Sequence, residues 1–351
     1  MNKTLHRFVF GVLLTSTGLF GGPLVFTPIS IRFNTPIGID YHQPTNSVVF
    51  SVQYPGGSPR NFERIDKDGN EIPFSSISGF TDEVKIATVR SGNMGGFVTG
   101  ELFTGNGVDG QIVRINPDGT SFINPWVDLP GTGNGLMRGS LYVDRSGVYG
   151  GDLLVATTVG QLWQVTSAGA STLISNLGVH LEGLMVIPND AARWGRYAGK
   201  IIAGAENQGL LHVFDKSGHI EALNLGIFPE DLDLIEANAN FFGVNYSQGR
   251  LLGVDAAQWT PYVGDIVVTQ EFPSVGSGLY RLYYDPAGAG SLKVESFSNG
   301  SPFAITQWEH VTFAPAGIKE IPPTTVVPEP ASGLLLLAGF GFAAIARRRT
   351  T

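Results

Sequence analysis

An eight-residue phrase recurs at a nearly constant interval through the middle of this 351-residue chain. Each copy alternates apolar with polar residues and ends in a turn such as Asp-Gly or Ser-Gly, which is typical of a strand that enters a hairpin. The four clearest copies are residues 62–69, 112–119, 162–169 and 211–218, and a looser copy covers 279–288. Their period is about 50 residues, and a strand-based repeat of that length predicts a β-propeller with one blade per repeat.

Further strand-like segments precede and follow the phrase and complete a blade of four strands. The segments that fit the second strand are 96–98, 151–155, 199–203 and 264–268. Those that fit the innermost strand are 38–41, 83–87, 182–186, 230–234 and 309–313, and outer strands are suggested at 171–174 and 220–223. We therefore expect an all-β fold with blades near 37–80, 83–130, 138–178 and 181–227, and with 229–316 as one enlarged blade or two. Six blades is the expected count, with five or seven as alternatives.

The composition excludes several classes of protein and site. The chain has no cysteine, so it has neither disulfides nor thiolate chemistry. The formal net charge of −8 offers no basic surface for a nucleic acid or an anionic membrane. The sequence lacks a nucleophile elbow, a phosphate loop and a His-Glu-x-x-His zinc motif.

The C-terminal segment has the organisation of a membrane-sorting tail. The residues Val327, Pro328, Glu329 and Pro330 precede an apolar run over 331–346, and Arg347, Arg348 and Arg349 follow it. Arginines beside an apolar span favour the cytoplasmic side, so we expect the body of the chain on the opposite side. The alternative is an ordinary anchor, although sixteen helical residues reach only about 24 Å of a hydrocarbon core that is roughly 30 Å thick.

This order of Val-Pro-Glu-Pro, apolar span and arginine cluster resembles the PEP-CTERM tail of exported proteins of Gram-negative bacteria. The resemblance covers about the last 25 residues. It implies a precursor held in the inner membrane by one transmembrane helix, processing by an exosortase-type membrane protease, and delivery to the cell surface or the exopolysaccharide matrix. The resemblance does not indicate what the body of the chain does there.

The N-terminus agrees with export. Lys3, His6 and Arg7 precede an apolar run over 8–14, which is typical of a signal peptide. We expect a helical signal peptide over 1–22, the propeller over 23–323 and the sorting tail over 324–351. No Ala-x-Ala pattern defines a cleavage site, so an uncleaved N-terminal anchor stays open.

Acidic side chains are expected to gather at one mouth of the propeller channel. Inner strands begin at one mouth, and the next, antiparallel strands return to it. The acids that open inner strands are Glu83, Glu182, Glu230 and Glu309, and those assigned to the ends of second strands are Glu101, Glu206 and Glu271, with His180, Asn207 and His310 close in sequence. Converging carboxylates repel one another unless a cation neutralises them, so the pattern suggests Ca²⁺ or a cationic ligand. Alternatively, these acids accept N–H bonds from loops between blades.

Tryptophans offer a second candidate for ligand binding. Trp163 belongs to the repeated phrase and is expected in the core. Trp194 and Trp259 fall in connecting segments, where they are candidates for exposed platforms that stack sugar rings.

The repeated phrase resembles the six-bladed propellers of the NHL-repeat and gluconolactonase-like class. That class includes calcium-dependent hydrolases as well as non-catalytic binding modules, so the resemblance does not select an activity. We expect a non-enzymatic module that binds exopolysaccharide or a surface protein, and we assign no catalytic residue. The alternative is a calcium-dependent hydrolase of the lactonase or phosphotriesterase-like class, in which a channel cation polarises a carbonyl or phosphoryl oxygen.

Overall fold

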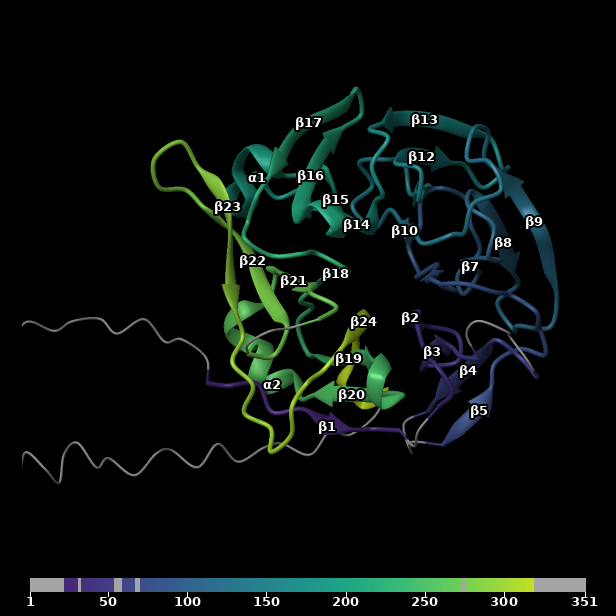
Figure 1. Ribbon diagram of the computed structural model, residues 1–351, viewed down its shortest axis with the longest axis horizontal. Helices are drawn as coiled ribbons and strands as arrows, with labels where there is room; N and C mark the ends of the chain where they lie inside the picture. Colours follow the sequence, from purple (N-terminus) through teal and green to yellow (C-terminus); the bar gives the residue numbers. More distant parts are fainter. Residues whose placement is uncertain (1–21, 31–32, 54–58, 67–69, 273–275, 319–351) are drawn as a thin grey trace, which may run out of the picture.

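The strands of the chain are arranged radially around a central opening (Figure 1). The computed structural model describes residues 22–30, 33–53, 59–66, 70–272 and 276–318. Within these ranges, the strands form six antiparallel sheets of four strands each. The structure therefore confirms the six-bladed propeller that the repeat predicts.

The first four blades follow one another along the chain. The first blade comprises β2 (Ile39–His42), β3 (Ser47–Ser51), β4 (Phe62–Ile65) and β5 (Glu71–Pro73). The second comprises β6 (Ile86–Thr88), β7 (Leu102–Gly105), β8 (Gln111–Ile115) and β9 (Phe122–Asp128). The third comprises β10 (Ser140–Val143), β11 (Leu153–Ala156), β12 (Gln161–Val165) and β13 (Ser171–Asn176). The fourth comprises β14 (Glu182–Val186), β15 (Ile201–Ala205), β16 (Leu210–Asp215) and β17 (Gly218–Leu223).

The last two blades are interleaved in sequence. The fifth blade comprises β18 (Leu232–Leu234), β21 (Ile266–Thr269), β22 (Leu279–Asp285) and β23 (Ser291–Ser296). Between β18 and β21 the chain makes the hairpin of β19 (Ala239–Asn245) and β20 (Arg250–Val254), which belongs to the sixth blade. The region 229–316 thus supplies one complete blade and three strands of another.

The sixth blade closes the ring with strands from both ends of the domain. Its inner strand is β24 (Trp308–Pro315), which pairs with β19, and its outer strand is β1 (Thr27–Pro28), which pairs with β20. β24 also contacts the inner strands β18 and β2 on either side of it. The ring is therefore complete only when the N-terminal and C-terminal strands have both joined the central hairpin.

Two one-turn helices place tryptophans between blades. α1 (Ala191–Trp194) and α2 (Ala256–Trp259) each begin after an aspartate whose carboxylate accepts backbone N–H bonds of the first turn. The capped turns direct Trp194 and Trp259 inward, and both side chains are fully buried. These two candidates for exposed platforms are therefore ruled out, whereas Trp163 lies in the core as expected.

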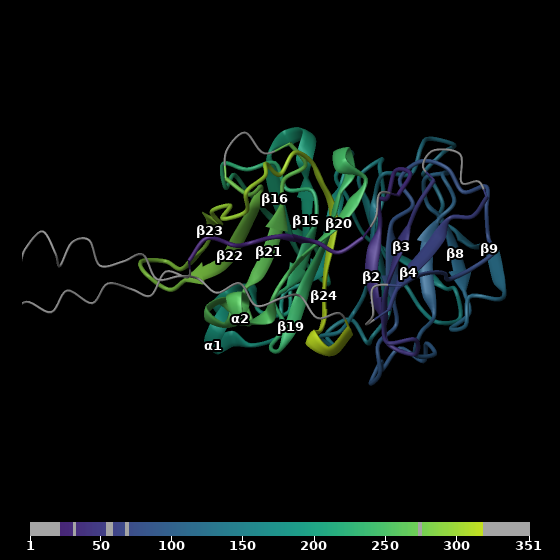
Figure 2. The same ribbon diagram turned by 90° about the horizontal axis from the view of Figure 1, so that it is seen from below.

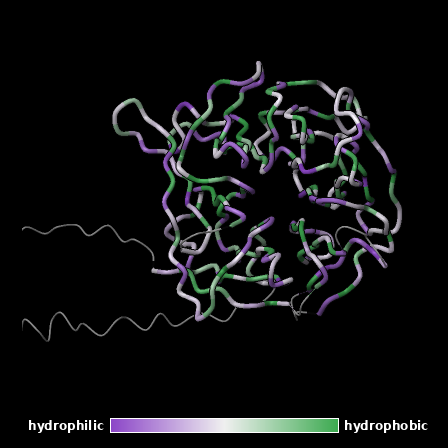
Figure 3. Tube along the Cα trace, in the orientation of Figure 1, coloured by the Kyte–Doolittle hydropathy of each residue, from purple (hydrophilic) through white to green (hydrophobic). Residues whose placement is uncertain are grey.

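The two faces of the ring differ because all the inner strands run in the same direction. We call the opening where the inner strands begin the upper mouth, and the opening where they end the lower mouth. In Figure 2, α1, α2 and the yellow turn that follows β24 all lie at the lower edge. Short 3₁₀ turns complete the connections: η1 (Gly195–Tyr197), η2 (Glu206–Gln208), η3 (Tyr246–Gln248), η4 (Thr260–Tyr262) and η5 (Ala316–Ile318). Hydrophilic segments border the central opening as well as the outer loops (Figure 3).

No helix in the ranges given above has the length and apolar character needed to cross a membrane. Apart from Gly22, the predicted signal peptide (1–22) and the predicted tail (324–351) lie outside the described residues.

Replacement of Trp259 by alanine is expected to lower the free energy of unfolding by about 3–5 kcal/mol, because it opens a cavity in the core. The indole packs against Phe241, Phe297 and Phe313 between the last two blades. Urea unfolding followed by tryptophan fluorescence and circular dichroism measures the change. Phe272→Ala, at a side chain that is 62% exposed, is the control and should change stability by less than about 0.5 kcal/mol. Equal effects of the two variants would contradict the assignment of Trp259 to the core.

Candidate functional site

Four glutamates converge at the upper mouth from four different blades. Carboxylate oxygens of Glu83, Glu182 and Glu230 lie within 4.8 Å of one another. Glu309 on β24 adjoins this group, since burial and then the charges of Glu230 and Glu83 raise its pKa. We call these four residues the upper carboxylate cluster.

A glycine permits the close approach of two inner strands in this cluster. Gly183 follows Glu182 with φ of +40°, a conformation that residues with side chains rarely adopt. A Cβ atom at this position would lie 2.4 Å from the carbonyl oxygen of Glu230. Glycine here therefore lets β14 and β18 bring their acids together.

A buried lysine that the sequence pattern did not single out lies within the cluster. The Lys85 Nζ atom is 3.0 Å from Glu230 Oε1 and 3.1 Å from Glu83 Oε2, and the residue is only 1% exposed. Burial alone would lower the pKa of Lys85, but the nearby Glu230 and Glu83 raise that pKa well above its usual value. The cluster thus contains a permanent cation of its own, close to where the sequence suggested a bound one.

The protonation of the cluster follows from burial and from this lysine. Burial and the charge of Glu230 raise the pKa of Glu182 to about 11, and burial likewise raises the pKa of Glu309 well above its usual value. Burial also acts to raise the pKa of Glu230, but Lys85 outweighs it and lowers that pKa. At neutral pH, Glu230 is therefore the ionised partner of Lys85, while Glu182 and Glu309 are protonated.

Neutral side chains connect the cluster to the surrounding loops. His180 Nε2 lies 3.1 Å from Glu182 Oε1 and 3.2 Å from the carbonyl oxygen of Arg138, and Asn207 Nδ2 lies 3.1 Å from His180 Nδ1. Burial lowers the pKa of His180, so the imidazole is neutral, with Nε2 as the donor and Nδ1 as the acceptor. The sequence pattern placed His180 and Asn207 near these acids, and the structure shows them in contact.

A groove opens beside the cluster and carries two further glutamates. It has a volume of about 390 Å³ and is lined by Glu206, Asn207, Phe228, Gln270, Glu271 and Phe272. Burial and the charge of Glu230 raise the pKa of Glu206 to about 8 and that of Glu271 to about 7. Among the residues that the structure describes, no lysine or arginine forms an ion pair with either carboxylate. We call this feature the upper groove.

Two exposed aromatic rings flank the acids of the upper groove. Phe228 is 52% exposed and Phe272 is 62% exposed. Gln307 orients one of the acids, because its Nε2 donates to Glu271 Oε1 at 2.6 Å and to Glu309 Oε1 at 3.3 Å. The phenylalanines and Gln307 lie in irregular connections outside the repeated phrase, so the repeat gave no reason to select them.

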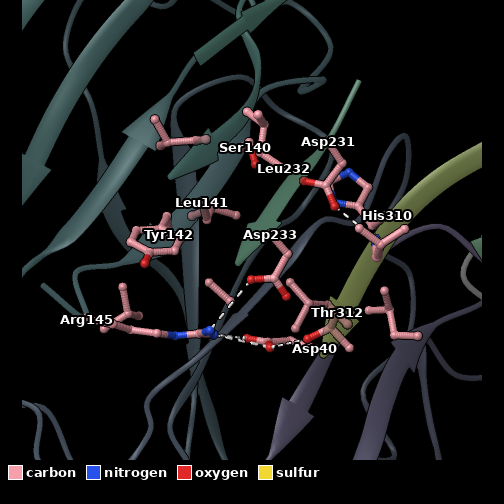
Figure 4. Close-up of a pocket in the computed structure, with 16 residues that line it drawn as sticks. Asp40, Ser140, Leu141, Tyr142, Arg145, Asp231, Leu232, Asp233, His310 and Thr312 are labelled. Carbon is pink, nitrogen blue, oxygen red and sulfur yellow. Dashed lines mark hydrogen bonds and ion pairs between the residues drawn. The ribbon is translucent and has the colours of Figure 1, made fainter. Parts of the chain in front are cut away.

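Below the upper mouth the channel narrows to a cavity of about 40 Å³ (Figure 4). A cavity of this size admits water molecules but is far below the roughly 300–1,000 Å³ of small-molecule pockets. Arg145 points between Asp40 and Asp233, and His310 Nδ1 lies 3.4 Å from Asp231 Oδ2. Burial, together with Lys85, lowers the pKa of His310 well below its usual value. His310 therefore lines the interior of the channel as a neutral side chain, one residue below Glu309.

Aspartates on inner strands connect neighbouring blades. Asp40 accepts the backbone N–H of Thr88 at 2.8 Å, and Asp231 accepts that of Val311 at 2.9 Å. Asp233 accepts that of Phe313 at 3.1 Å. Acids therefore do accept hydrogen bonds between blades. In these three bonds, however, the acids are aspartates inside the channel, and the donors are N–H groups of strands rather than of loops.

Glu101 lies away from the upper mouth, contrary to expectation. The segment 96–98, expected as the second strand of its blade, lies in the irregular connection before the strand, and the strand is β7, which begins at Leu102. The glycines of this connection adopt positive φ angles, at Gly96 and Gly100, which interrupt a strand. Glu101 therefore precedes its strand on the lower side, where it accepts from Arg114 Nη2 at 2.6 Å and Nε at 2.9 Å.

The sequence comparisons identify the C-terminal segment. Residues 326–349 match the family of the PEP-CTERM protein-sorting motif. The chain carries a PEP-CTERM sorting signal. This motif indicates an exported protein with a membrane-anchored precursor in a Gram-negative bacterium, and it implies processing by an exosortase membrane protein. A comparison with curated protein sequences gave no match.

Solved structures similar to this chain have low sequence identity to it. A chain of the nidogen–laminin complex is 13% identical with a TM-score of 0.52, and the alignment covers 80% of this chain and 85% of that one. A protein described as a candidate gluconolactonase is 12% identical with a TM-score of 0.49, covering 84% and 93%. A gluconolactonase from Xanthomonas campestris is 12% identical with a TM-score of 0.45, covering 70% and 86%. At these identities the likeness concerns the fold alone.

Replacement of Lys85 by methionine is expected to destabilise the protein by about 3–5 kcal/mol near pH 7, because it leaves buried carboxylates without their cation. Without the lysine, the folded-state pKa of Glu230 rises above its unfolded value, so the folded state binds more protons and stability falls as pH rises. The loss should therefore be larger at pH 8 than at pH 5, as measured by urea unfolding. The exposed Lys293→Met is the control, and a pH-independent loss in Lys85→Met would contradict this account.

Proposed function

We propose that this protein is an exported, non-enzymatic propeller that binds a cationic ligand in the upper groove. The observation that carries the proposal is the pair of carboxylates, Glu206 and Glu271, that face the groove without a cationic partner among the described residues. The PEP-CTERM signal supports export, and the propeller supplies a rigid frame for the groove.

The charge balance at the upper mouth favours a positive ligand. Of the six glutamates around the mouth, Glu182 and Glu309 are neutral and Glu230 is paired with Lys85. Glu83 has Lys85 and, at 3.8 Å, Arg138 beside it, which leaves Glu206 and Glu271 as the acids without an ion-pair partner among the described residues. Burial and the charge of Glu230 raise the pKa values of Glu206 and Glu271, so that both are partly protonated near neutral pH. An ammonium group placed between them would favour their ionised forms, so binding would release protons and gain charge-assisted hydrogen bonds.

The remaining side chains of the groove favour a sugar that carries amino groups. The rings of Phe228 and Phe272 offer apolar faces on which sugar rings stack, and the amides of Asn207 and Gln270 can hydrogen-bond to hydroxyl groups. An open groove also admits a polymer, whereas an enclosed pocket would not. The ligand class we propose is therefore an amine-bearing polysaccharide of the cell surface or matrix, in keeping with the destination that the sorting signal suggests.

A calcium-dependent hydrolase is the second candidate, and one observation favours it. Three carboxylates within 4.8 Å of one another are a plausible oxygen cage for Ca²⁺. However, the ammonium of Lys85 lies about 3 Å from two of them, and a second cation there would be repelled. The narrow cavity below the cluster also leaves no room for a substrate. We therefore propose that Lys85 takes the place of a metal.

Oligomers of glucosamine are expected to bind to the full-length protein in detergent, and fully N-acetylated oligomers of the same length are expected to bind at least tenfold more weakly. Isothermal titration calorimetry measures both affinities. Glu206→Gln should weaken glucosamine binding about tenfold, because it removes one charge-assisted hydrogen bond. Glu295→Gln, on the outer strand of the fifth blade, is the control. Equal affinity for the two oligomers, or none for either, would rule out the proposed ligand class.

Calcium titration separates the two candidate functions. We expect the unaltered protein to show no Ca²⁺ binding tighter than millimolar, and Lys85→Gln, if folded by circular dichroism, to gain affinity for Ca²⁺. Micromolar binding by the unaltered protein that disappears in Glu182→Gln would instead support the hydrolase.

A further inference from the structure

The chain leaves the propeller at its lower face, beside the channel. β24 runs from the upper mouth to the lower mouth and ends at Pro315. The turn η5 follows, fixed by a hydrogen bond from Ala316 N to Asn238 O at 3.1 Å and one from Asn240 Nδ2 to Ala316 O at 3.3 Å. The sorting motif therefore follows a point that is held firmly on the lower face.

The distance from this point to the membrane is limited by the length of the chain. The matched motif begins at residue 326, and its apolar run begins at Ala331, thirteen residues after Ile318. Thirteen residues span at most about 45 Å, even when fully extended. The lower face can approach the bilayer within this limit without any detour.

Turning the upper mouth toward the bilayer would require a long detour. The connecting chain would have to pass across the four strands of a blade, roughly 14 Å, and then climb the length of eight-residue β24, roughly 26 Å. The detour of about 40 Å would use nearly the whole connection, drawn out straight, and ordering it in that way costs conformational entropy.

We propose that in the membrane-anchored precursor the lower face of the propeller lies against the bilayer surface, and that the upper groove faces away from it. This orientation rests on the sorting signal and on the direction of β24, and it does not depend on the ligand proposed above. The groove would then be open to ligands before the tail is processed.

The connection between β6 and β7 supplies apolar side chains to the lower face. Met94 is 68% exposed and Val98 is 56% exposed. This connection lies next to the chain exit, because Arg90 at its start donates from Nη2 to the carbonyl oxygen of Phe313 at 3.2 Å. Exposed apolar side chains at this position can enter the headgroup region of a bilayer.

Single-cysteine labelling tests the orientation, since the chain contains no cysteine of its own. Met94→Cys reports on the lower face. Leu136→Cys, at a residue that is 56% exposed in the connection before β10, reports on the upper face. The full-length precursor would be labelled with a fluorophore and reconstituted into vesicles of phosphatidylethanolamine and phosphatidylglycerol that carry a headgroup-attached quencher. We expect at least twofold stronger quenching at position 94 than at position 136. Equal quenching, or the reverse order, would overturn the proposal.

A longer connection tests whether the chain length sets the orientation. Insertion of twenty glycine and serine residues after Pro323 in both labelled variants is expected to reduce the difference in quenching. An unchanged difference would overturn the role assigned to the length of the connection. Because both labels sit on exposed side chains, retention of the native circular dichroism spectrum is the control for folding. Failure of glucosamine oligomers to bind would leave this result unaffected, so the two proposals can fail separately.

Discussion

A buried ion pair across the channel is the interaction on which the upper mouth depends. Lys85 belongs to the second blade and Glu230 to the fifth, so their contact at 3.0 Å joins opposite sides of a six-bladed ring. The lysine also sets the protonation of its neighbours, because it keeps Glu230 ionised while burial keeps Glu182 and Glu309 neutral. The inner strands converge on a common axis and bring their glutamates together. The ammonium group of Lys85 neutralises the carboxylate that stays ionised among them, Glu230.

Much of the architecture could be predicted because the length of the repeat indicates where each blade begins and ends. The period of about 50 residues located four blades to within a few residues, and the same phrase marked the third strand of the fifth. The sequence could not show that β19 and β20 belong to the sixth blade, because strand pairing there skips over a neighbour in the chain. The sequence analysis assigned Glu101 to the wrong mouth because β7 begins several residues later than predicted, after a connection rich in glycine.

The candidate site was accessible to sequence reasoning only in part. Acids at the start of inner strands carry a positional signal, and the structure brings Glu83, Glu182 and Glu230 together at the upper mouth. Lys85 lies two residues after Glu83, in a segment that is otherwise apolar. A charged residue in such a segment could have been recognised from the sequence as a candidate member of the site. Phe228 and Phe272 could not be selected in this way, because they lie in irregular connections, where the sequence has no repeating pattern. Trp194 and Trp259 follow a capped turn whose direction only the packed blades determine.

The composite sixth blade has a consequence for the way an exported chain must fold. Among the described strands, its inner strand, β24, is the last to be synthesised, while its outer strand, β1, is the first. Until β24 arrives, the hairpin of β19 and β20 has an unpaired edge in the place where ring closure will occur, and such edges promote aggregation. We therefore expect a chain that still lacks β24 to be an open, five-bladed intermediate, which persists until the C-terminal strand joins the hairpin.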